Sequence, residues 1–258
     1  MRFRSLLITI SFAVLGLYGV LVLSLFYFFS PSHFLNTLFS QRVLFSIRLS
    51  LLAATMATFL SVVLAIPSAY AISRFHFRGK NLIDTVLEFP MIVSPAALGA
   101  MILIFFNTPV GDLLQQSGIH FIFALPGIIL AQFMTTVGIA TRLIKTALDE
   151  IPVRYENVAR SLGVSPQVAF LTITLPLAKK GIIASSILTW AKALGEFGAT
   201  ITVAGSMAMR TETIPIALFM RLSNADIEGT VLLIFILLIT GLGILYFSRL
   251  LFKKTTYA

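Results

Sequence analysis

The sequence contains no cysteine and few charged side chains. Without cysteine the chain can form no disulfide, thiolate zinc site, iron–sulfur cluster or cysteine nucleophile. Charged residues make up 11% of the 258 residues, against about 25% in an ordinary soluble domain. Because 58% of the residues are hydrophobic, too few polar side chains exist to cover a surface that faces water, which excludes a soluble enzyme and a disordered chain. The composition predicts an integral membrane protein.

Common catalytic motifs are also missing. The chain has no G-x-x-x-x-G-K-[ST] phosphate-binding loop, no H-E-x-x-H metal motif and no G-x-S-x-G nucleophile motif. Its three histidines lie far apart in the sequence, at His33, His76 and His120. We therefore expect no catalytic residue, no metal site and no cofactor on this chain.

Six apolar segments are long enough to cross a membrane as helices, which takes roughly 20 residues each. They cover residues 6–29, 46–72, 84–106, 122–144, 180–204 and 229–250. The first follows a charged start but is longer than the apolar region of a signal peptide, so we expect it to be retained. The predicted fold class is an all-α bundle of six transmembrane helices, forming one domain over residues 1–258 and surrounded by membrane lipid.

The basic residues predict how this bundle is oriented. The net charge is +9, which in a soluble protein would suggest a nucleic-acid partner. In membrane proteins, however, Lys and Arg gather on the cytoplasmic side, and we expect no nucleic-acid partner. With the amino terminus inside, 14 Lys and Arg residues fall on the cytoplasmic side and 4 outside. Both termini are thus predicted to be cytoplasmic, with Arg42, Arg48, Arg210 and Arg221 on the outer side.

The longest predicted cytoplasmic connection contains YENVARSLGVSPQVAFLTITLP, residues 155–176. Gly163 suits the left-handed position that ends a helix, and Ser165 and Pro166 suit the start of the next one. The pattern predicts two short helices joined by a tight turn, with Pro176 ending the second before the fifth span. An apolar ridge would consist of Val158, Leu162, Val168 and either Phe170 or Leu171. Such a segment either packs against its own bundle or presents a rigid surface to a cytoplasmic partner.

The same segment resembles the EAA motif of ABC importer permeases, E-A-A-x3-G-x9-I-x-L-P. Two of its positions depart from the motif: Asn157 replaces Glu and Val158 replaces Ala, and Glu156, one residue earlier, is a candidate for the missing carboxylate. The resemblance implies a coupling helix over 155–176 that docks into a groove of a separate ATPase subunit, which binds ATP and Mg. Asn157, Val158 and Ala159 take the E-A-A places of the motif, and Gly163, Ile173, Leu175 and Pro176 match the rest at the correct spacing.

The fifth predicted span carries two charges. Lys192 and Glu196 are four residues apart, so they share a face of a helix. Each costs roughly 2.5–3.5 kcal/mol at the centre of a bilayer, so both should face protein or water, and an intramembrane ionisable pair marks a candidate functional site. We expect a translocation pathway or gate here, with a purely structural ion pair or a short proton relay as alternatives. The other candidate residues are Gly195 and Gly198, which permit close helix approach, and Thr200 and Thr202.

The strings GEFGATIT, residues 195–202, and GSMAMRTETIPIALF, residues 205–219, resemble permeases of the oxyanion branch, most closely those for molybdate. The resemblance implies an importer of molybdate, or of tungstate or sulfate, in a prokaryotic inner membrane. It also implies a homodimer and a periplasmic binding protein that delivers the oxyanion. Arg210 would lie near the outer mouth, where it could attract a dianion, pair with Glu212, or contact the binding protein.

Two other classes of membrane protein remain open from the residues alone. A secondary transporter or channel would work without ATP and use Lys192 and Glu196 for ion coupling. Such transporters often contain inverted repeats, and none is evident in this sequence. A structural membrane subunit without a pathway would leave the polar fifth span unexplained.

Overall fold

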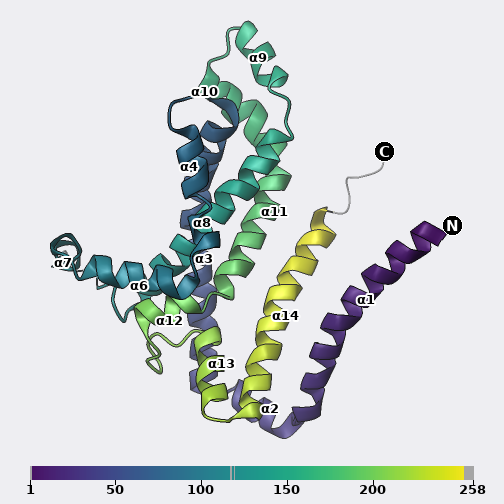
Figure 1. Ribbon diagram of the computed structural model, residues 1–258, viewed down its shortest axis with the longest axis vertical. Helices are drawn as coiled ribbons and strands as arrows, with labels where there is room; N and C mark the ends of the chain where they lie inside the picture. The colour runs from purple at the N-terminus through teal and green to yellow at the C-terminus, as the bar shows by residue number, and fades with distance from the viewer. Residues whose placement is uncertain (1, 117, 119, 253–258) are drawn as a thin grey trace.

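The computed structural model describes residues 2–116, 118 and 120–252, and within them the regular elements are helices without any strand. Figure 1 shows their arrangement. In chain order they are α1 (Arg2–Leu25), the 3₁₀ turn η1 (Phe26–Phe28), α2 (Pro31–Leu38), α3 (Gln41–Arg74), α4 (Lys80–Val86), α5 (Phe89–Ile92), α6 (Pro95–Phe106), α7 (Pro109–Gln116), α8 (Leu125–Asp149), α9 (Arg154–Ser161), α10 (Pro166–Ala169), the π-helical turn η2 (Phe170–Thr174), α11 (Leu175–Leu194), α12 (Gly198–Ala204), α13 (Ile214–Ser223) and α14 (Ile227–Phe252).

The centre of the bundle is formed by α3, α8 and α11 (Figure 1). Small side chains line their contact, because helices in a membrane approach closely where residues are small. Ala65, Ala69 and Ala140 are fully buried there, beside Ile144 and Leu148. A hydrogen bond of 2.9 Å between the Ser61 and Thr136 hydroxyls also joins α3 to α8. These three helices therefore behave as one packed unit.

Five helices are long and apolar enough to cross a membrane. They are Phe3–Phe28, Gln41–Arg74, Leu125–Asp149, Pro166–Leu194 and Ile227–Tyr246. The span predicted at 84–106 is instead a pair of helical limbs, Lys80–Ile92 and Pro95–Phe106, with a bend of 109° between them. The described residues thus contain six spans if this bent pair counts as one and five otherwise, so the prediction of six transmembrane helices is only partly confirmed.

The bend between α5 and α6 follows from Pro95. Proline disfavours the helical conformation in the residue before it, and Ser94 is extended, with φ −60° and ψ 145°. The Ser94 hydroxyl then caps α6 by accepting a hydrogen bond of 3.3 Å from the Ala97 amide. The sequence therefore ends one helix and starts another at this point.

The span predicted at 180–204 ends at Ala204 as expected, but it begins earlier than predicted and is interrupted between α11 and α12. Pro176 does not end a helix; it lies in the first turn of α11, which continues directly from η2. A proline ring clashes with the carbonyl four residues earlier in a regular α-helix, and the wider π turn over Phe170–Thr174 changes the backbone spacing at that point. At the other end, α11 stops at Leu194 because glycine weakens the helix at Gly195 and Gly198.

Two ends of the molecule are distinguished by their elements (Figure 1). The start of α1, the end of α14 and the α9–α10 segment point toward one end, while α2 and α13 lie toward the other. The most apolar stretch of α1 contains no buried residue. This stretch is therefore not packed into the core formed by α3, α8 and α11.

Candidate functional site

The turn between α9 and α10 has the predicted conformation. Gly163 has φ +87°, in the left-handed region that favours glycine. The Ser165 hydroxyl caps α10 by accepting a hydrogen bond of 3.4 Å from the Val168 amide. No atom lies within 4 Å of the place that a Cβ on Gly163 would occupy. Gly163 is thus required by the backbone of an open turn and not by packing.

One face of this segment is apolar and exposed. Leu162 is 80% exposed and Val158 is 61% exposed. Val168 and Leu171 continue the ridge, at 48% and 57%, whereas Phe170 is only half-exposed. Of the positions that match the EAA motif, Ala159 is buried, Ile173 and Leu175 are half-buried, and Asn157, Val158, Gly163 and Pro176 are exposed.

Glu156 points away from that ridge. Its side chain is buried and accepts three hydrogen bonds: 2.9 Å from the Tyr70 hydroxyl, 3.0 Å from Arg74 Nε and 2.6 Å from the Thr174 hydroxyl. Burial alone would raise the pKa of Glu156, but the hydrogen bonds from Thr174, Tyr70 and Arg74 and the charge of Arg74 lower it below its ordinary value. The carboxylate is therefore charged at neutral pH and is directed into the protein.

The ion pair in the membrane region forms at the break after α11. Lys192 Nζ lies 2.6 Å from Glu196 Oε2. The Glu196 side chain is 1% exposed, whereas that of Lys192 is 42% exposed. Glu196 Oε1 also accepts a hydrogen bond of 3.2 Å from the Ala199 amide and so caps α12. The two charges meet as predicted, but the helix ends between them.

The neighbouring glycines and threonines differ in their surroundings. A Cβ on Gly198 would lie 3.1 Å from both Ala96 N and Pro95 Cβ, so Gly198 permits a close approach of α12 to the start of α6. Gly195 has no comparable contact, its nearest neighbour being the Ala191 carbonyl of its own helix, 3.7 Å away. Thr202 is half-buried and its hydroxyl donates to the Gly198 carbonyl at 2.7 Å.

Thr200 is fully buried, and within the part of the chain that the structure describes its hydroxyl has no hydrogen-bond partner. This side chain therefore faces the interior of the protein.

The contact between α6 and α12 yields a prediction about packing. A Cβ on Gly99 of α6 would lie 2.8 Å from Thr202 Cβ and 2.9 Å from the Ala199 carbonyl. Gly99→Ala is therefore expected to lower the melting temperature of the purified protein in detergent, because overpacking costs about 1–3 kcal/mol. Gly195→Ala serves as the matched control and should melt like the wild type. Equal melting of all three proteins would contradict the close contact.

Glu212, in the loop between α12 and α13, pairs with Arg42 of α3. Its side chain is 1% exposed and binds Arg42 through two hydrogen bonds, of 2.7 Å from Nε and 2.6 Å from Nη2. Arg210 is exposed and lies 4.0 Å from the Met207 sulfur. The proposed pairing of Arg210 with Glu212 is therefore wrong. The sequence pointed to Arg42 only as one of the four basic residues predicted to lie on the outer side.

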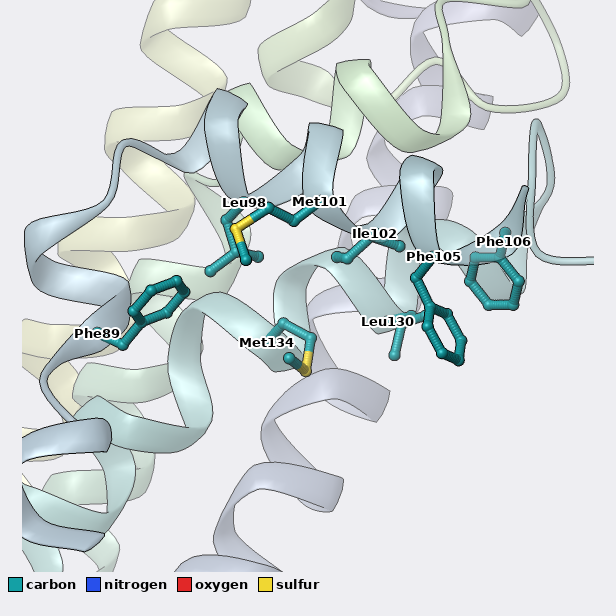
Figure 2. A pocket seen from close by; sticks show the side chains of 8 residues that line it. All are labelled: Phe89, Leu98, Met101, Ile102, Phe105, Phe106, Leu130 and Met134. Carbon is teal, nitrogen blue, oxygen red and sulfur yellow. The ribbon is translucent and has the colours of Figure 1, made fainter. Parts of the chain in front are cut away.

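A cavity of about 330 Å³ lies between α5, α6 and α8 (Figure 2). Its lining is apolar: Phe89, Leu98, Met101, Ile102, Phe105, Phe106, Leu130 and Met134. An oxyanion would lose its hydration there without gaining a hydrogen bond, which is costly. This cavity is consequently no place for an anionic substrate.

Comparison with known proteins decides the family. Residues 57–257 match the family described as the inner membrane component of binding-protein-dependent transport systems. The chain belongs to this family. It is 34% identical over 205 residues to the molybdenum transport system permease protein ModB of Haemophilus influenzae, covering 78% of this chain and 90% of that protein. It is 36% identical over 177 residues to ModB of Escherichia coli, covering 67% and 77%.

This inner membrane component also resembles a sulfate permease and two importers of known structure. It is 35% identical over 187 residues to the sulfate transport system permease protein CysW of Synechococcus elongatus, covering 72% of this chain and 65% of that protein. A bacterial ABC transporter that imports alginate has the same fold, with a TM-score of 0.78 at 17% identity over 99% of this chain and 96% of that one. The methionine ABC transporter MetNI gives 0.65 at 17% identity over 82% and 95%.

Proposed function

We propose that this chain is the transmembrane subunit of an ATP-driven molybdate importer. The observation that carries the proposal is the exposed apolar ridge on α9 and α10, held on a rigid turn at Gly163. A membrane subunit without a phosphate-binding loop must receive energy from another protein, and such a ridge can dock into an ATPase that binds ATP and Mg. The names of the two ModB relatives support molybdate as cargo.

The docking surface consists of the outward-facing positions of the segment. Val158 and Leu162 supply apolar contact, and Asn157 supplies a polar group where the motif has a carboxylate. Ala159, Ile173 and Leu175 hold the segment on the bundle from its inner side. Pro176 lies at the start of α11, where the segment joins the membrane part.

The pathway passes the break at residues 195–197. Lys192 is the cation that an oxyanion meets there, because its side chain is 42% exposed although it lies in an apolar span. Glu196 holds Lys192 in place and caps α12, so it acts as a gate residue. Gly195 and Gly198 allow the break, while Thr200 and Thr202 lie on α12 beside it. Arg210, exposed on the outer side, attracts the dianion or contacts the binding protein.

The assembly we propose has two copies of this chain as a single-domain permease, an ATPase on the α9 side and a periplasmic binding protein on the α13 side. Both termini are cytoplasmic. Figure 1 supports this orientation, because the start of α1 and the end of α14 point toward the same end as α9. The 14-to-4 distribution of basic residues supports it too.

Uptake of labelled molybdate tests this function. Cells that lack their own high-affinity permease would receive the chain together with its ATPase and binding protein, with tungstate or sulfate in excess. We expect uptake that requires the ATPase and is blocked by tungstate but not by sulfate. Block by sulfate would keep the importer and change its cargo, as the CysW similarity allows. Uptake without the ATPase would instead favour a secondary transporter.

A further inference from the structure

Arg74, the last residue of α3, is buried at the base of the coupling segment. Its side chain is 5% exposed. Nη2 donates to the Leu148 carbonyl at the end of α8, at 3.0 Å, and to the Ile151 carbonyl just after that helix, at 2.8 Å. Nε donates to Glu156 at 3.0 Å, in the first turn of α9. One guanidinium thus connects three elements that are far apart in the sequence.

The Glu156 carboxylate extends this connection to a fourth element. Tyr70, one turn before Arg74 on α3, donates to Glu156 Oε2 at 2.9 Å. Thr174, in the π turn that leads into α11, donates to Oε1 at 2.6 Å. The four side chains therefore form one hydrogen-bonded network, here called the Arg74 network, between α3, α8, α9 and η2.

The Arg74 network and the apolar ridge occupy opposite faces of α9. Glu156 and Ala159 are buried, whereas Val158 and Leu162 are exposed. A partner that binds the ridge therefore exerts its force on α9. The opposite face of α9 is bound through Arg74 to the ends of α3 and α8. Because α3, α8 and α11 form one packed unit, a displacement of α9 reaches all three of them.

Stability is a weak reason for this arrangement. Burying an ion pair costs desolvation, and replacing it by apolar residues of similar volume is often neutral or stabilising. A fully satisfied network does fix the relative positions of its members. We propose that Arg74 is a positioning residue, which holds the coupling segment so that its movement is passed to α3, α8 and α11 as a single body. This inference rests on the proposed importer function.

The double variant Arg74→Gln/Glu156→Gln tests the inference. Removing both charges together leaves no unpaired charge buried in the protein, so the complex should still assemble. The measurement is the number of ATP molecules hydrolysed per molybdate transported, in proteoliposomes that contain the ATPase and the binding protein. We expect the ratio to rise roughly tenfold or more, because the ATPase still turns over while transport falls. Tyr70→Phe removes one hydrogen bond without changing charge and should give an intermediate ratio.

The ion pair between Arg142 and Glu88 provides the matched control. Arg142 of α8 also lies 3.6 Å from Asp84 of α4, so all three charges are removed together, and within the described residues no hydrogen bond or ion pair of Arg142 reaches the coupling segment. Arg142→Gln/Glu88→Gln/Asp84→Asn should leave the ratio unchanged. If the Arg74→Gln/Glu156→Gln variant assembles with its partners and hydrolyses as much ATP per molybdate as the wild type, the inference is overturned. The inference is also overturned if ATP hydrolysis, transport and the amount of copurified ATPase all fall in proportion. That result would show that the Arg74 network only supports assembly of the complex. Wild-type uptake that needs no ATP would refute the importer function instead.

Discussion

Replacing Gly163 with tryptophan is expected to abolish ATP-driven uptake while the protein still inserts in the membrane. The positive φ of Gly163 costs a non-glycine residue roughly 1–2 kcal/mol, too little to unfold the bundle. The space around the position is open within this chain, so the indole would project into the surface where we propose that the ATPase docks. Uptake and copurification of the ATPase measure the effect, and both should fall to background.

Gly79 offers the matched control for this substitution. It has φ +89° and open space around it, and it lies in the turn before α4, outside the coupling segment. Gly79→Trp therefore imposes the same backbone strain without obstructing the ridge, and uptake should persist. If both variants lose uptake equally, the loss is caused by impaired folding and not by obstruction of the ridge. Normal uptake by the Gly163 variant would count against docking at this turn.

Glu196→Gln is expected to slow uptake about tenfold, a change of ~1.4 kcal/mol in the barrier, with little loss of protein from the membrane. A glutamine oxygen can still accept the hydrogen bond from the Ala199 amide, so α12 stays capped. Lys192, however, loses the charge that holds it at 2.6 Å. An unpaired cation beside the pathway would bind the dianion more tightly and release it more slowly. Initial rates over a range of molybdate concentrations would show a lower maximal rate.

The double variant Lys192→Met/Glu196→Gln separates a gate from a structural pair. Both charges are then absent, and a merely structural pair should be replaced without effect on transport. We expect the double variant to transport poorly as well, because it lacks Lys192, the cation that we propose meets the oxyanion. Wild-type rates in the double variant would remove both residues from the mechanism.

Features that depend on neighbouring residues were predictable from the sequence. The long apolar stretches gave four spans close to their observed bounds, and glycine and serine chemistry gave the turn at Gly163 and the cap at Ser165. The same local rules failed for Pro176, because a π turn before it accommodates the ring. The 109° bend at residues 93–94 was not predicted either, although Pro95 disfavours a helical conformation in the residue before it.

Contacts between distant residues could not be predicted in this way. Arg74 and Glu156 are 82 positions apart, and Arg42 and Glu212 are 170 apart. Nothing local in the sequence shows that such residues meet, since packing of α3 against α8 and α13 brings them together. Glu156, the candidate carboxylate for the surface that faces the ATPase, is directed into the protein. The pairing of Glu212 with Arg42 is likewise evident only in the structure.

The contact of Gly198 with Pro95 and Ala96 brings the starts of α6 and α12 together. Peptide dipoles give each helix start a partial positive charge of roughly half a unit, so the two starts repel each other. Glu196 lies at this junction and accepts from the Ala199 amide, and its negative charge offsets that repulsion. The residue that neutralises Lys192 thus also stabilises the positively charged starts of two helices that run side by side in the same direction. Changing its charge alters the electrostatic potential along both helices at once.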